Sequence, residues 1–274
     1  NMQKISDSLD LEIPQDDQAG GAGKTRSAFM DLYSVGTRWH MNKYGTTQKQ
    51  LAVIASKNHY HSSMNPNAQL QKKKSVEEIL GARGVSWPLT VPMCAPVGDG
   101  AAGAFLCSSD FLKKIKDSRP VKILASALGS GTDRGMDEEK MDIACRVSQK
   151  AYEMAGVGPE DIHVAEVHDA TAFGELYQKE KLGFCADGEG GIFAESGATA
   201  LTGKLPVNPS GGLISRGHPI GASGLAQIYE LVTQLREEAG KRQAGNPRIA
   251  MAENGGGTIG LGEAAMCIHI LEKK

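Results

Sequence analysis

Apolar and polar positions follow two different patterns along this chain. The first 85 residues or so are mixed and polar, and within them Ala28–Tyr44 and Thr47–Asn58 predict helices. Residues 75–80 (SVEEIL) predict a further short helix, because a serine followed by acidic residues is a helix start signal. The sequence therefore predicts that this part of the chain consists of helices and loops.

Beyond residue 85 the runs of apolar residues are longer, and patterns typical of strands alternate with patterns typical of helices. Trp87–Met93 predicts a strand, Gly98–Ser108 predicts a buried strand of small residues, and Phe111–Ile115 predicts a helix. Further along, strands and helices alternate. The strands are Val121–Leu128, His163–Val167, Ile249–Glu253 and Ala264–Leu271, and the helices are Asp137–Ala155, Phe173–Leu182 and the segment after Gly224. Such alternation implies a layered α/β sheet.

A glycine-rich loop, Val207–Gly224 (VNPSGGLISRGHPIGASG), carries one histidine and opens into an amphipathic helix. Glycines let backbone N–H groups approach a ligand closely, and the dipole at a helix start favours negative charge there. His218 in this loop is placed for proton transfer near neutral pH. On glycine spacing alone, a structural loop with an incidental histidine is an equal alternative.

Two of the predicted strands deliver a polar residue to their ends. His168 follows Val167 directly, and Glu253 precedes a run of glycines. In open α/β sheets, ligands bind outside the carboxyl ends of the strands. We therefore expect both residues to lie in a common site.

Three short motifs occur in the order that is typical of the thiolases. They are VHDA (Val167–Ala170), GHPIGASG (Gly217–Gly224) and ENGGG (Glu253–Gly257), and the segment His40–Gln69 is similar to the sterol-carrier-protein type of thiolase. The resemblance covers essentially the whole chain. It implies a thiolase-like α/β/α layering of sheets with an inserted loop domain, in which the N-terminal half of the fold is incomplete.

By the same resemblance the chain divides into three parts. Residues 1–85 would form the loop domain, which contacts CoA and other subunits. Residues 86–117 would be the strand and helix that return to the N-terminal thiolase half, and residues 118–274 would be the C-terminal half. The chain begins part-way through the pattern, after the region that carries the nucleophilic cysteine. We expect the 118–274 half to expose an apolar face where that region would pack.

The resemblance assigns roles to individual residues. His218 matches the histidine that activates the nucleophilic thiol, and His168 matches the position that helps to bind the thioester oxygen. Gly255 would offer its N–H to a second oxyanion hole. Contacts to CoA or substrate would come from Ala95, Pro96, Val97, Asn208, Ser210 and Gly217. Each of these residues also has a purely structural interpretation, as part of a loop or a strand end.

The chain departs from the pattern at the acid/base cysteines. Thiolases carry a cysteine in a Cys-x-Gly or a His-Asp-Cys motif, but Glu253 and Ala170 stand at the matching positions here. One hypothesis is that Glu253, desolvated at a buried strand end, has a raised pKa and transfers the proton. The equal alternative is a structural carboxylate that caps the loop. Asp169 is expected to orient the loop rather than to react.

Neither Cys94 nor Cys185 is expected to be the nucleophile. The cysteines, at positions 94, 107, 145, 185 and 267, form no Cys-x-x-Cys pair, which indicates reduced thiols and no zinc or other metal site. The run Lys72–Lys74 could meet the phosphates of CoA, although a solvated charge run explains it more simply.

Overall composition restricts the partners. The formal net charge is −2 and aromatic residues make up 5% of the chain, so nothing favours a nucleic-acid surface. No run of apolar residues is long enough to span a membrane. The absence of a disulfide framework and of a signal-peptide core in residues 1–14 predicts a cytoplasmic location.

The resemblance to the thiolases implies a thiolase-type acyltransferase that cleaves 3-oxoacyl-CoA with CoA. No covalently bound cofactor is expected, CoA is the co-substrate, and the cysteine nucleophile would lie outside these 274 residues. Two alternatives stay open: a thiolase-like aldolase that cleaves side-chain CoA esters, and a non-catalytic scaffold that binds acyl-CoA.

Several partners are expected by resemblance. They are a second copy of the chain (a dimer or a dimer of dimers), a separate chain that supplies the N-terminal thiolase part, and a small zinc-ribbon/OB-fold protein. Relatives with ENGGG-type loops resemble enzymes that degrade bulky substrates such as aromatic succinyl-CoA thioesters.

Overall fold

A four-stranded sheet lies at the centre of the C-terminal part of the chain. The computed structural model describes residues 27–274 apart from 136, 137 and 261. The strand order is β3 (Val121–Ser130), β6 (Ala265–Lys273), β5 (Ile249–Gly256), β4 (Val164–Glu166). The β4–β5 pair is parallel and the other two pairs are antiparallel.

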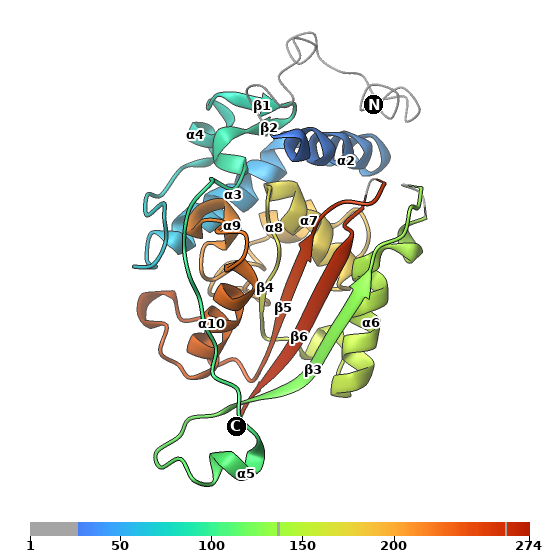
Figure 1. Ribbon diagram of the computed structural model, residues 1–274. Coiled ribbons are helices and arrows are strands. Elements are labelled where there is room, and N and C mark those ends of the chain that lie inside the picture. The colour runs from blue at the N-terminus through green and yellow to red at the C-terminus, as the bar shows by residue number, and fades with distance from the viewer. Residues whose placement is uncertain (1–26, 136–137, 261) are drawn as a thin grey trace.

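One long helix packs on each face of this sheet (Figure 1). Helix α6 (Ile143–Ala155) covers β3 and β6, and its Ala144, Val147 and Ala151 are buried against Met266 and Ile268. Helix α10 (Ser223–Leu235) covers β4 and β5 on the opposite face, where Leu231 and Leu235 pack on Val164, Ala250 and Ala252. The predicted α/β layering is therefore confirmed.

Local signals in the sequence set the ends of these elements. The Asp142 side chain accepts a hydrogen bond from the Ala144 N–H at the start of α6, and Gly156 ends the helix with φ +69°, a value that favours glycine. The helix is shorter than the predicted Asp137–Ala155 because residues 139–141 form a separate 3₁₀ turn, η3 (Glu139–Met141). Residues 136 and 137 lie outside the described part of the chain.

Shorter helices connect the strands. They are α7 (Ala172–Lys181), α8 (Gly190–Glu195) and α9 (Gly212–Arg216), together with the 3₁₀ turns η4 (Pro159–Asp161) and η5 (Gly240–Arg242). Helix α7 follows β4 after one short turn, and Thr171 caps its start by accepting from the Gly174 N–H. The predicted strand–helix order in this half is confirmed.

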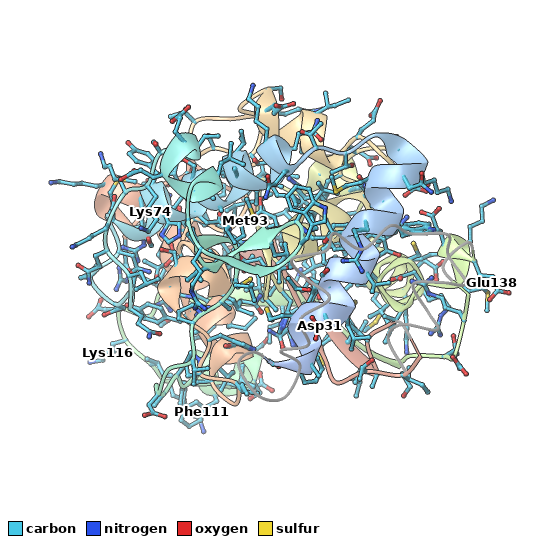
Figure 2. The ribbon with its side chains drawn as sticks, turned by 90° about the horizontal axis from the view of Figure 1, so that it is seen from above. Asp31, Lys74, Met93, Phe111, Lys116 and Glu138 are labelled. Carbon is cyan, nitrogen blue, oxygen red and sulfur yellow. The ribbon has the colours of Figure 1, made fainter. Side chains whose placement is uncertain are left out.

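A layer of helices lies across one end of the sheet. It contains α2 (Ala28–Tyr44), α3 (Gln48–Ser62) and α4 (Val76–Leu80), the hairpin β1 (Gly84–Ser86)–β2 (Leu89–Thr90) and the turn η2 (Val91–Met93). In Figure 2, which looks down on this layer, Lys74 and Met93 come from it, while Phe111 and Lys116 belong to a more distant segment. Capping boxes at Thr47/Gln50 and Ser75/Glu78 start α3 and α4.

Helix α3 joins this layer to the sheet half. Its Leu51 and Ile54 share one buried cluster with Phe173 and Leu176 of α7 and Ile214 of α9. The layer coincides with most of the predicted 1–85 part, although the β1–β2 hairpin extends across residue 85. The three-part division stays a prediction, and residues 1–26 lie outside the described range.

The segment between η2 and β3 differs from its prediction. Gly98–Ser108 forms no strand, and Phe105 and Leu106 are 77% and 73% exposed. It runs from the helical layer along the molecule to α5 (Ser109–Leu112), near the C-terminus (Figure 1). The predicted buried strand is wrong because small residues alone do not bury a segment: it needs a paired strand on each side, and the described residues supply none. The predicted strand Trp87–Met93 is likewise reduced to β2 and η2.

The C-terminal half exposes apolar side chains on its α10 side, as expected. Leu128 of β3 points away from α6, and α10 turns Leu225 and Tyr229 outward, together with Ile220 of the preceding loop. Val97, Phe105 and Leu106 of the long connecting segment are exposed as well. In the described part of the chain, no helix combines the length and the hydropathy that a membrane span requires.

Candidate active site

Two histidine rings meet edge to face beyond the ends of the central strands. His168 follows β4 and His218 precedes α10, and their ring centroids lie 5.2 Å apart at an interplanar angle of 89°. They are separated by 50 residues in sequence, so only the fold brings them together. The predicted pairing of the VHDA and GHPIGASG loops is thus present in the structure.

Hydrogen bonding defines the tautomer of His218. Its Nδ1 lies 2.7 Å from the Ser223 Oγ, and that hydroxyl donates to the Pro219 carbonyl oxygen. The single Ser223 hydroxyl proton can serve only one of these contacts, so both hydrogen bonds form at once only when Nδ1 carries the ring proton and donates it to Ser223. The Nε2 atom is left with a lone pair. Burial and the Arg216 cation lower the pKa of His218, so the neutral imidazole prevails at pH 7.

His168 is more deeply buried than His218. Its side chain is 8% exposed, and burial, His218 and the Arg216 cation lower its pKa to about 3. Its Nδ1 atom is buried with no hydrogen-bond partner among the described residues. A neutral imidazole with an unused nitrogen is suited to donate to, or accept from, a ligand atom.

The connecting segment runs beside the His218 loop. Val97 pairs with His218 in a parallel bridge, and the Ala95 N–H donates to the Ala170 carbonyl oxygen at 2.9 Å. Gln69 of the helical layer joins the two loops: its Nε2 donates to the Val97 carbonyl oxygen, and its side chain fills the space that a Cβ on Gly217 would need. Gly217 has φ +110°, so both sterics and backbone conformation require glycine there.

Val97 and Gly217 thus lie beside His218, and Ala95 lies beside the VHDA loop at Ala170. Contacts of Ala95, Pro96, Val97 and Gly217 with CoA stay a prediction. Asn208 and Ser210 do not lie there: both are fully buried behind it. The Asn208 side chain accepts from the Val167 N–H and donates to Glu175, and Ser210 donates to Glu166 from both its N–H and its hydroxyl. These hydrogen bonds hold the loop onto β4 and leave both side chains without access to a ligand.

A buried polar network fixes the VHDA loop. The Asp169 carboxylate accepts from the Leu213 N–H at 2.6 Å and from the Asn58 amide at 2.8 Å. Glu175 of α7 accepts from Asn58 and Asn208 and pairs with Lys57 at 2.9 Å. Helix α3, β4 and the His218 loop are therefore held in register around the histidine pair. This agrees with the expectation that Asp169 orients the loop.

Glu253 lies on the opposite side of the sheet from the two rings. Side chains of successive strand residues alternate in direction, and Glu253 shares its face with Met251, which packs on the α6 side. Its side chain is fully buried, and its Oε2 accepts from the His168 N–H at 2.8 Å. Burial and the nearby Glu263 raise its pKa well above the ordinary value. The geometry favours the loop-capping alternative over the direct proton-transfer hypothesis.

Gly255 sits at the end of β5 beyond the β4 pairing. A Cβ there would collide with the Glu263 carboxylate, which accepts from Gln178 at 3.1 Å and whose pKa burial raises to about 8. The proposed oxyanion role of the Gly255 N–H stays a prediction.

Comparison with known proteins identifies the family. A family model described as thiolase C-terminal domain-like matches residues 133–272. The chain belongs to the thiolase family. Over 249 residues it is 43% identical to an acetyl-CoA acetyltransferase from Methanothermobacter thermautotrophicus, a match that covers 89% of this chain and 63% of the relative.

Other relatives fall in the branches that the motifs indicate. The thiolase chain is 43% identical over 234 residues to sterol carrier protein 2 from Oryctolagus cuniculus, covering 83% of this chain and 42% of that protein. It is 38% identical over 228 residues to benzoylsuccinyl-CoA thiolase subunit BbsB from Thauera aromatica, covering 82% and 59%. The chain therefore spans less than two thirds of the length of each of these relatives.

A solved structure described as the Ltp2-ChsH2(DUF35) aldolase is also similar. It superposes with a TM-score of 0.76 at 25% sequence identity, over 89% of this chain and 63% of that chain. The sterol-carrier-type resemblance predicted from the sequence is thus confirmed, and the same scaffold is found in a protein that is called an aldolase.

Sequence reasoning missed Asn254 in this thiolase chain. It follows Glu253 on β5, so it points to the α10 face, where its amide donates to Gln227 of α10 at 3.1 Å and lies against Gly224. It therefore shares a face with both histidines. Successive side chains of a strand point to opposite faces, and this rule could have identified Asn254. The motif instead singles out Glu253, which aligns with the family cysteine. Ser223, five residues after His218, was missed because its role depends on loop conformation.

The cysteines of the chain are not placed as nucleophiles. Burial raises the pKa of Cys94 and of Cys185 to about 12, so both thiols are protonated at neutral pH. Cys94 packs against the apolar cluster beneath α3. This fits the prediction that neither residue attacks the substrate.

The Lys72–Lys74 run lies on the surface of the helical layer. The Lys73 ammonium sits 4.6 Å from the centroid of the Tyr60 ring, and Ser56 donates to the Lys74 carbonyl oxygen. A cation resting on an exposed tyrosine needs no ligand to explain it. A role in CoA binding stays a prediction.

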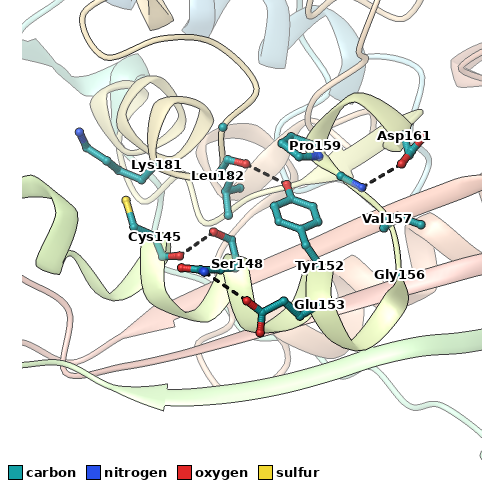
Figure 3. A pocket seen from close by; sticks show the side chains of 13 residues that line it. Cys145, Ser148, Tyr152, Glu153, Gly156, Val157, Pro159, Asp161, Lys181 and Leu182 are labelled. Carbon is teal, nitrogen blue, oxygen red and sulfur yellow. Dashed lines mark hydrogen bonds between the residues drawn. The ribbon is translucent and has the colours of Figure 1, made fainter.

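One surface hollow lies away from the histidines. A shallow hollow of about 580 Å³ runs along α6, η4 and the end of α7. Figure 3 shows the Tyr152 hydroxyl donating to the Leu182 carbonyl oxygen across its floor. Its lining residues mainly bond to one another, so it is a seam between helices and carries no chemistry comparable to that of the histidine pair.

Proposed function

We propose that this chain forms the base and oxygen-binding side of a thiolase-type acyltransferase that cleaves 3-oxoacyl-CoA with CoA. The observation that carries the proposal is the edge-to-face His168–His218 pair, with the Nε2 lone pair of His218 left unused by the protein. An imidazole that is neutral at pH 7 and oriented through its second nitrogen is suited to deprotonate a thiol.

His218 would accept the proton of a cysteine thiol that lies outside these 274 residues. The thiolate then attacks the 3-keto carbonyl and the bond between C2 and C3 breaks. The acyl group stays on sulfur, and the proton held by His218 passes to C2, so that the remaining fragment leaves as a CoA ester. The CoA thiol then gives its proton to His218 and attacks the acyl-enzyme, which releases a shortened acyl-CoA and returns the proton to the cysteine sulfur. His168 would hydrogen-bond the thioester oxygen, because its unpartnered Nδ1 already needs a partner.

Positioning falls to buried groups in this proposal. Glu253 would hold the His168 backbone through its Oε2, and Gly255 would present its N–H to a second oxyanion. Ala95, Pro96, Val97 and Gly217 would line the CoA channel, while Asn208 and Ser210 would support it from behind. The carboxamide of Asn254 would contact the acyl group.

An aldolase is the second candidate. The similarity to the Ltp2-ChsH2(DUF35) aldolase favours it, and so does the lack of cysteine at Ala170 and Glu253. The GHP motif around His218 argues against it, because in the thiolases that motif holds the histidine that activates the nucleophilic thiol. The third candidate is a non-catalytic scaffold that binds acyl-CoA.

Partner chains belong to the proposal as well. The similar aldolase is named for two components, Ltp2 and ChsH2, and the similar benzoylsuccinyl-CoA thiolase protein is named as a subunit. We propose a small zinc-ribbon/OB-fold partner, association into a dimer or a dimer of dimers, and thiolase segments that complete the exposed apolar face, in a cytoplasmic enzyme.

One assay separates the three candidates. The protein, purified with the chains that accompany it, is incubated with 3-oxoacyl-CoA in the presence and absence of CoA, and separately with 3-hydroxyacyl-CoA without CoA. Products are followed by chromatography. Cleavage of 3-oxoacyl-CoA that requires CoA supports thiolysis. Cleavage of 3-hydroxyacyl-CoA without CoA identifies the aldolase, because a retro-aldol step needs a β-hydroxyl group. The absence of cleavage in all arms contradicts both enzymatic candidates and leaves the scaffold.

A further inference from the structure

A second hollow lies at the opposite end of the sheet from the histidine pair. Its volume is about 610 Å³, and it is bounded by α5 with the linker that follows, the start of β3, the end of α10 and the end of β6. Helix α10 begins beside the His218 loop and ends at this hollow, so its length of about 20 Å separates the two places. Figure 1 shows α5 and the C-terminus together at this end, away from the helical layer.

Cations surround this hollow. Among the described residues that line it none is acidic, and five of the eleven are basic: Lys113, Arg119, Arg236, Lys273 and Lys274. The whole chain has 30 basic and 32 acidic residues, so its composition does not account for this excess. The hollow along α6 is about as large, at 580 Å³, and its lining mixes Glu153 and Asp161 with Lys181. The positive charge is therefore particular to the second hollow.

The cations come from separate segments of the chain. The dipole of a helix favours a basic side chain at its C-terminus, which by itself would explain Arg236 after α10. Arg119 instead lies in the linker between α5 and β3, and Lys273 ends β6. The fold thus gathers like charges from three places. Their mutual repulsion opposes this arrangement, and a bound anion would relieve it.

Existing ion pairs leave capacity for an anion. Three of the cations pair with acids outside the lining, as Lys113–Asp110, Arg119–Glu238 and Lys273–Glu237. These side chains are exposed in large part, and exposed ion pairs contribute little stability, so a ligand can compete with them. The Arg236 Nε donates to the Arg119 carbonyl oxygen at 2.9 Å, and no described carboxylate pairs with its other two nitrogens. Because Arg236 is exposed, those nitrogens are open to a ligand.

The floor of the hollow is apolar. It consists of Leu112, Pro120, Val121 and Leu235. Leu235 belongs to the buried cluster between α10 and the sheet, and Val121 packs against that cluster, so the floor is held rigidly. A small inorganic ion would meet the cations and leave the floor in water. A ligand with an apolar body and an anionic head covers both parts.

We propose that this hollow binds an amphiphilic anion, whose apolar body covers the floor between Leu112 and Leu235 and whose carboxylate or phosphate head meets Arg236 and Lys113. The site goes beyond the proposed acyl transfer and does not depend on it. Binding makes and breaks no covalent bond.

Binding of octyl compounds tests the proposal on the protein with its accompanying chains. The probes are octanoate, octyl phosphate, 1-octanol, acetate and inorganic phosphate, each measured by calorimetry. We expect octanoate or octyl phosphate to bind at least about tenfold more tightly than 1-octanol and than either small ion. The tighter of the two octyl anions identifies the head group. Added NaCl should weaken its binding, because the cations are exposed to the solvent.

Variants of lining residues locate the probe. Arg236→Gln should weaken the octyl anion about tenfold while leaving 1-octanol binding and the melting temperature unchanged. Arg83→Gln is the matched control, since Arg83 is an exposed arginine of the helical layer, and it should bind like the wild type. Leu112→Ser should weaken 1-octanol and the octyl anion alike, because it removes part of the floor.

Four results would overturn the proposal. Absence of binding of either octyl anion removes the site, and equal binding of 1-octanol shows that the charge plays no part. Equal binding of acetate or inorganic phosphate shows a hollow that takes small ions only. Weakening by His218→Ala and not by Arg236→Gln places the octyl anion in the candidate active site. None of these measurements involves cleavage of 3-oxoacyl-CoA, so this proposal and the acyltransferase function are tested separately.

Discussion

The two faces of the sheet differ sharply at the point where β4 and β5 end. On the α10 face, His168, His218 and Asn254 gather around atoms that the protein leaves without partners. On the α6 face, Glu253 is fully buried: its Oε2 holds the loop from beneath, and its Oε1 has no hydrogen-bond partner among the described residues. Glu253 and Asn254 are adjacent in sequence, so a single step along a strand separates a supporting role from a ligand-facing one.

Burial has opposite effects on the pKa values of the ionisable groups on the two faces of the sheet. Burial of the histidines lowers their pKa and keeps them neutral, which prepares a base. Burial of Glu253 and Glu263 raises their pKa and keeps them protonated, which removes charge from the interior. The same low dielectric environment thus produces a reactive face and an inert one.

The largest effect is expected at His218. His218→Ala should lower kcat/KM for CoA-dependent cleavage about 10³-fold, within the range for loss of a general base, with an unchanged melting temperature. The exposed His163→Ala serves as a matched control and should keep wild-type turnover. Steady-state kinetics on both variants decides the matter, and a His218→Ala enzyme with more than a tenth of wild-type activity would contradict the assigned role.

The next effect tests the sealed face. Glu253→Ala should destabilise the fold by about 2–4 kcal/mol, because the His168 N–H loses its acceptor and a cavity forms. Glu253→Gln keeps an acceptor oxygen and should retain turnover to within about threefold, since the uncharged amide mimics the protonated carboxyl. Denaturant titration and kinetics measure the two outcomes.

Asn254→Ala provides the counterpart to these variants on the reactive face. It should lower kcat/KM while changing stability little. A Glu253→Gln variant that folds but loses more than 100-fold in turnover would reverse the comparison and restore the proton-transfer hypothesis.

A smaller effect is expected at Ser223. Ser223→Ala removes the acceptor that orients the His218 Nδ1–H, so the ring loses its preferred tautomer and kcat should fall about tenfold. KM should change little, because Ser223 does not contact the proposed ligand space. Ser223→Thr keeps the hydroxyl and is expected to recover most of the loss; unchanged kcat in Ser223→Ala would mean that another group orients the ring.

The smallest effect concerns the pH dependence of stability. The folded-state pKa of Glu263 is about 8 against an ordinary 4.5, so the folded state retains a proton that the unfolded state loses. This carboxyl therefore reduces the free energy of unfolding as pH rises from about 4.5 to about 8. Glu263→Gln should remove that part of the slope and stabilise the protein more at pH 8 than at pH 5. Equal slopes in thermal melts of both proteins would contradict this.

Local signals in the sequence were enough to predict most of the elements. The boundaries of α2 agree with the prediction to the residue, and the strands of the C-terminal half were found because their apolar runs are short and bounded by turns. Gly98–Ser108 failed because burial depends on neighbouring strands, about which a run of small residues carries no information.

The candidate site could be predicted only in part. The VHDA and GHPIGASG motifs identified His168 and His218, because each motif is a short run of neighbouring residues that can be recognised in the sequence alone. Motifs could not show that Asn208 and Ser210 are spent on buried hydrogen bonds, or that the His168 Nδ1 lacks a hydrogen-bond partner among the described residues. These facts depend on which groups from distant segments come within 3 Å of each other.

The sequence by itself determined the helices, the strands, the thiolase motifs and the order of the three loops, because each of these depends on residues close together in the chain. Only the tertiary structure decided which side chain of the Glu253–Asn254 pair faces the imidazoles and which buried polar atoms are left without partners. The reason is physical: orientation and hydrogen-bond satisfaction are settled by contacts between strands and loops that lie 30 to 90 residues apart in the chain, as at His168 and Glu253.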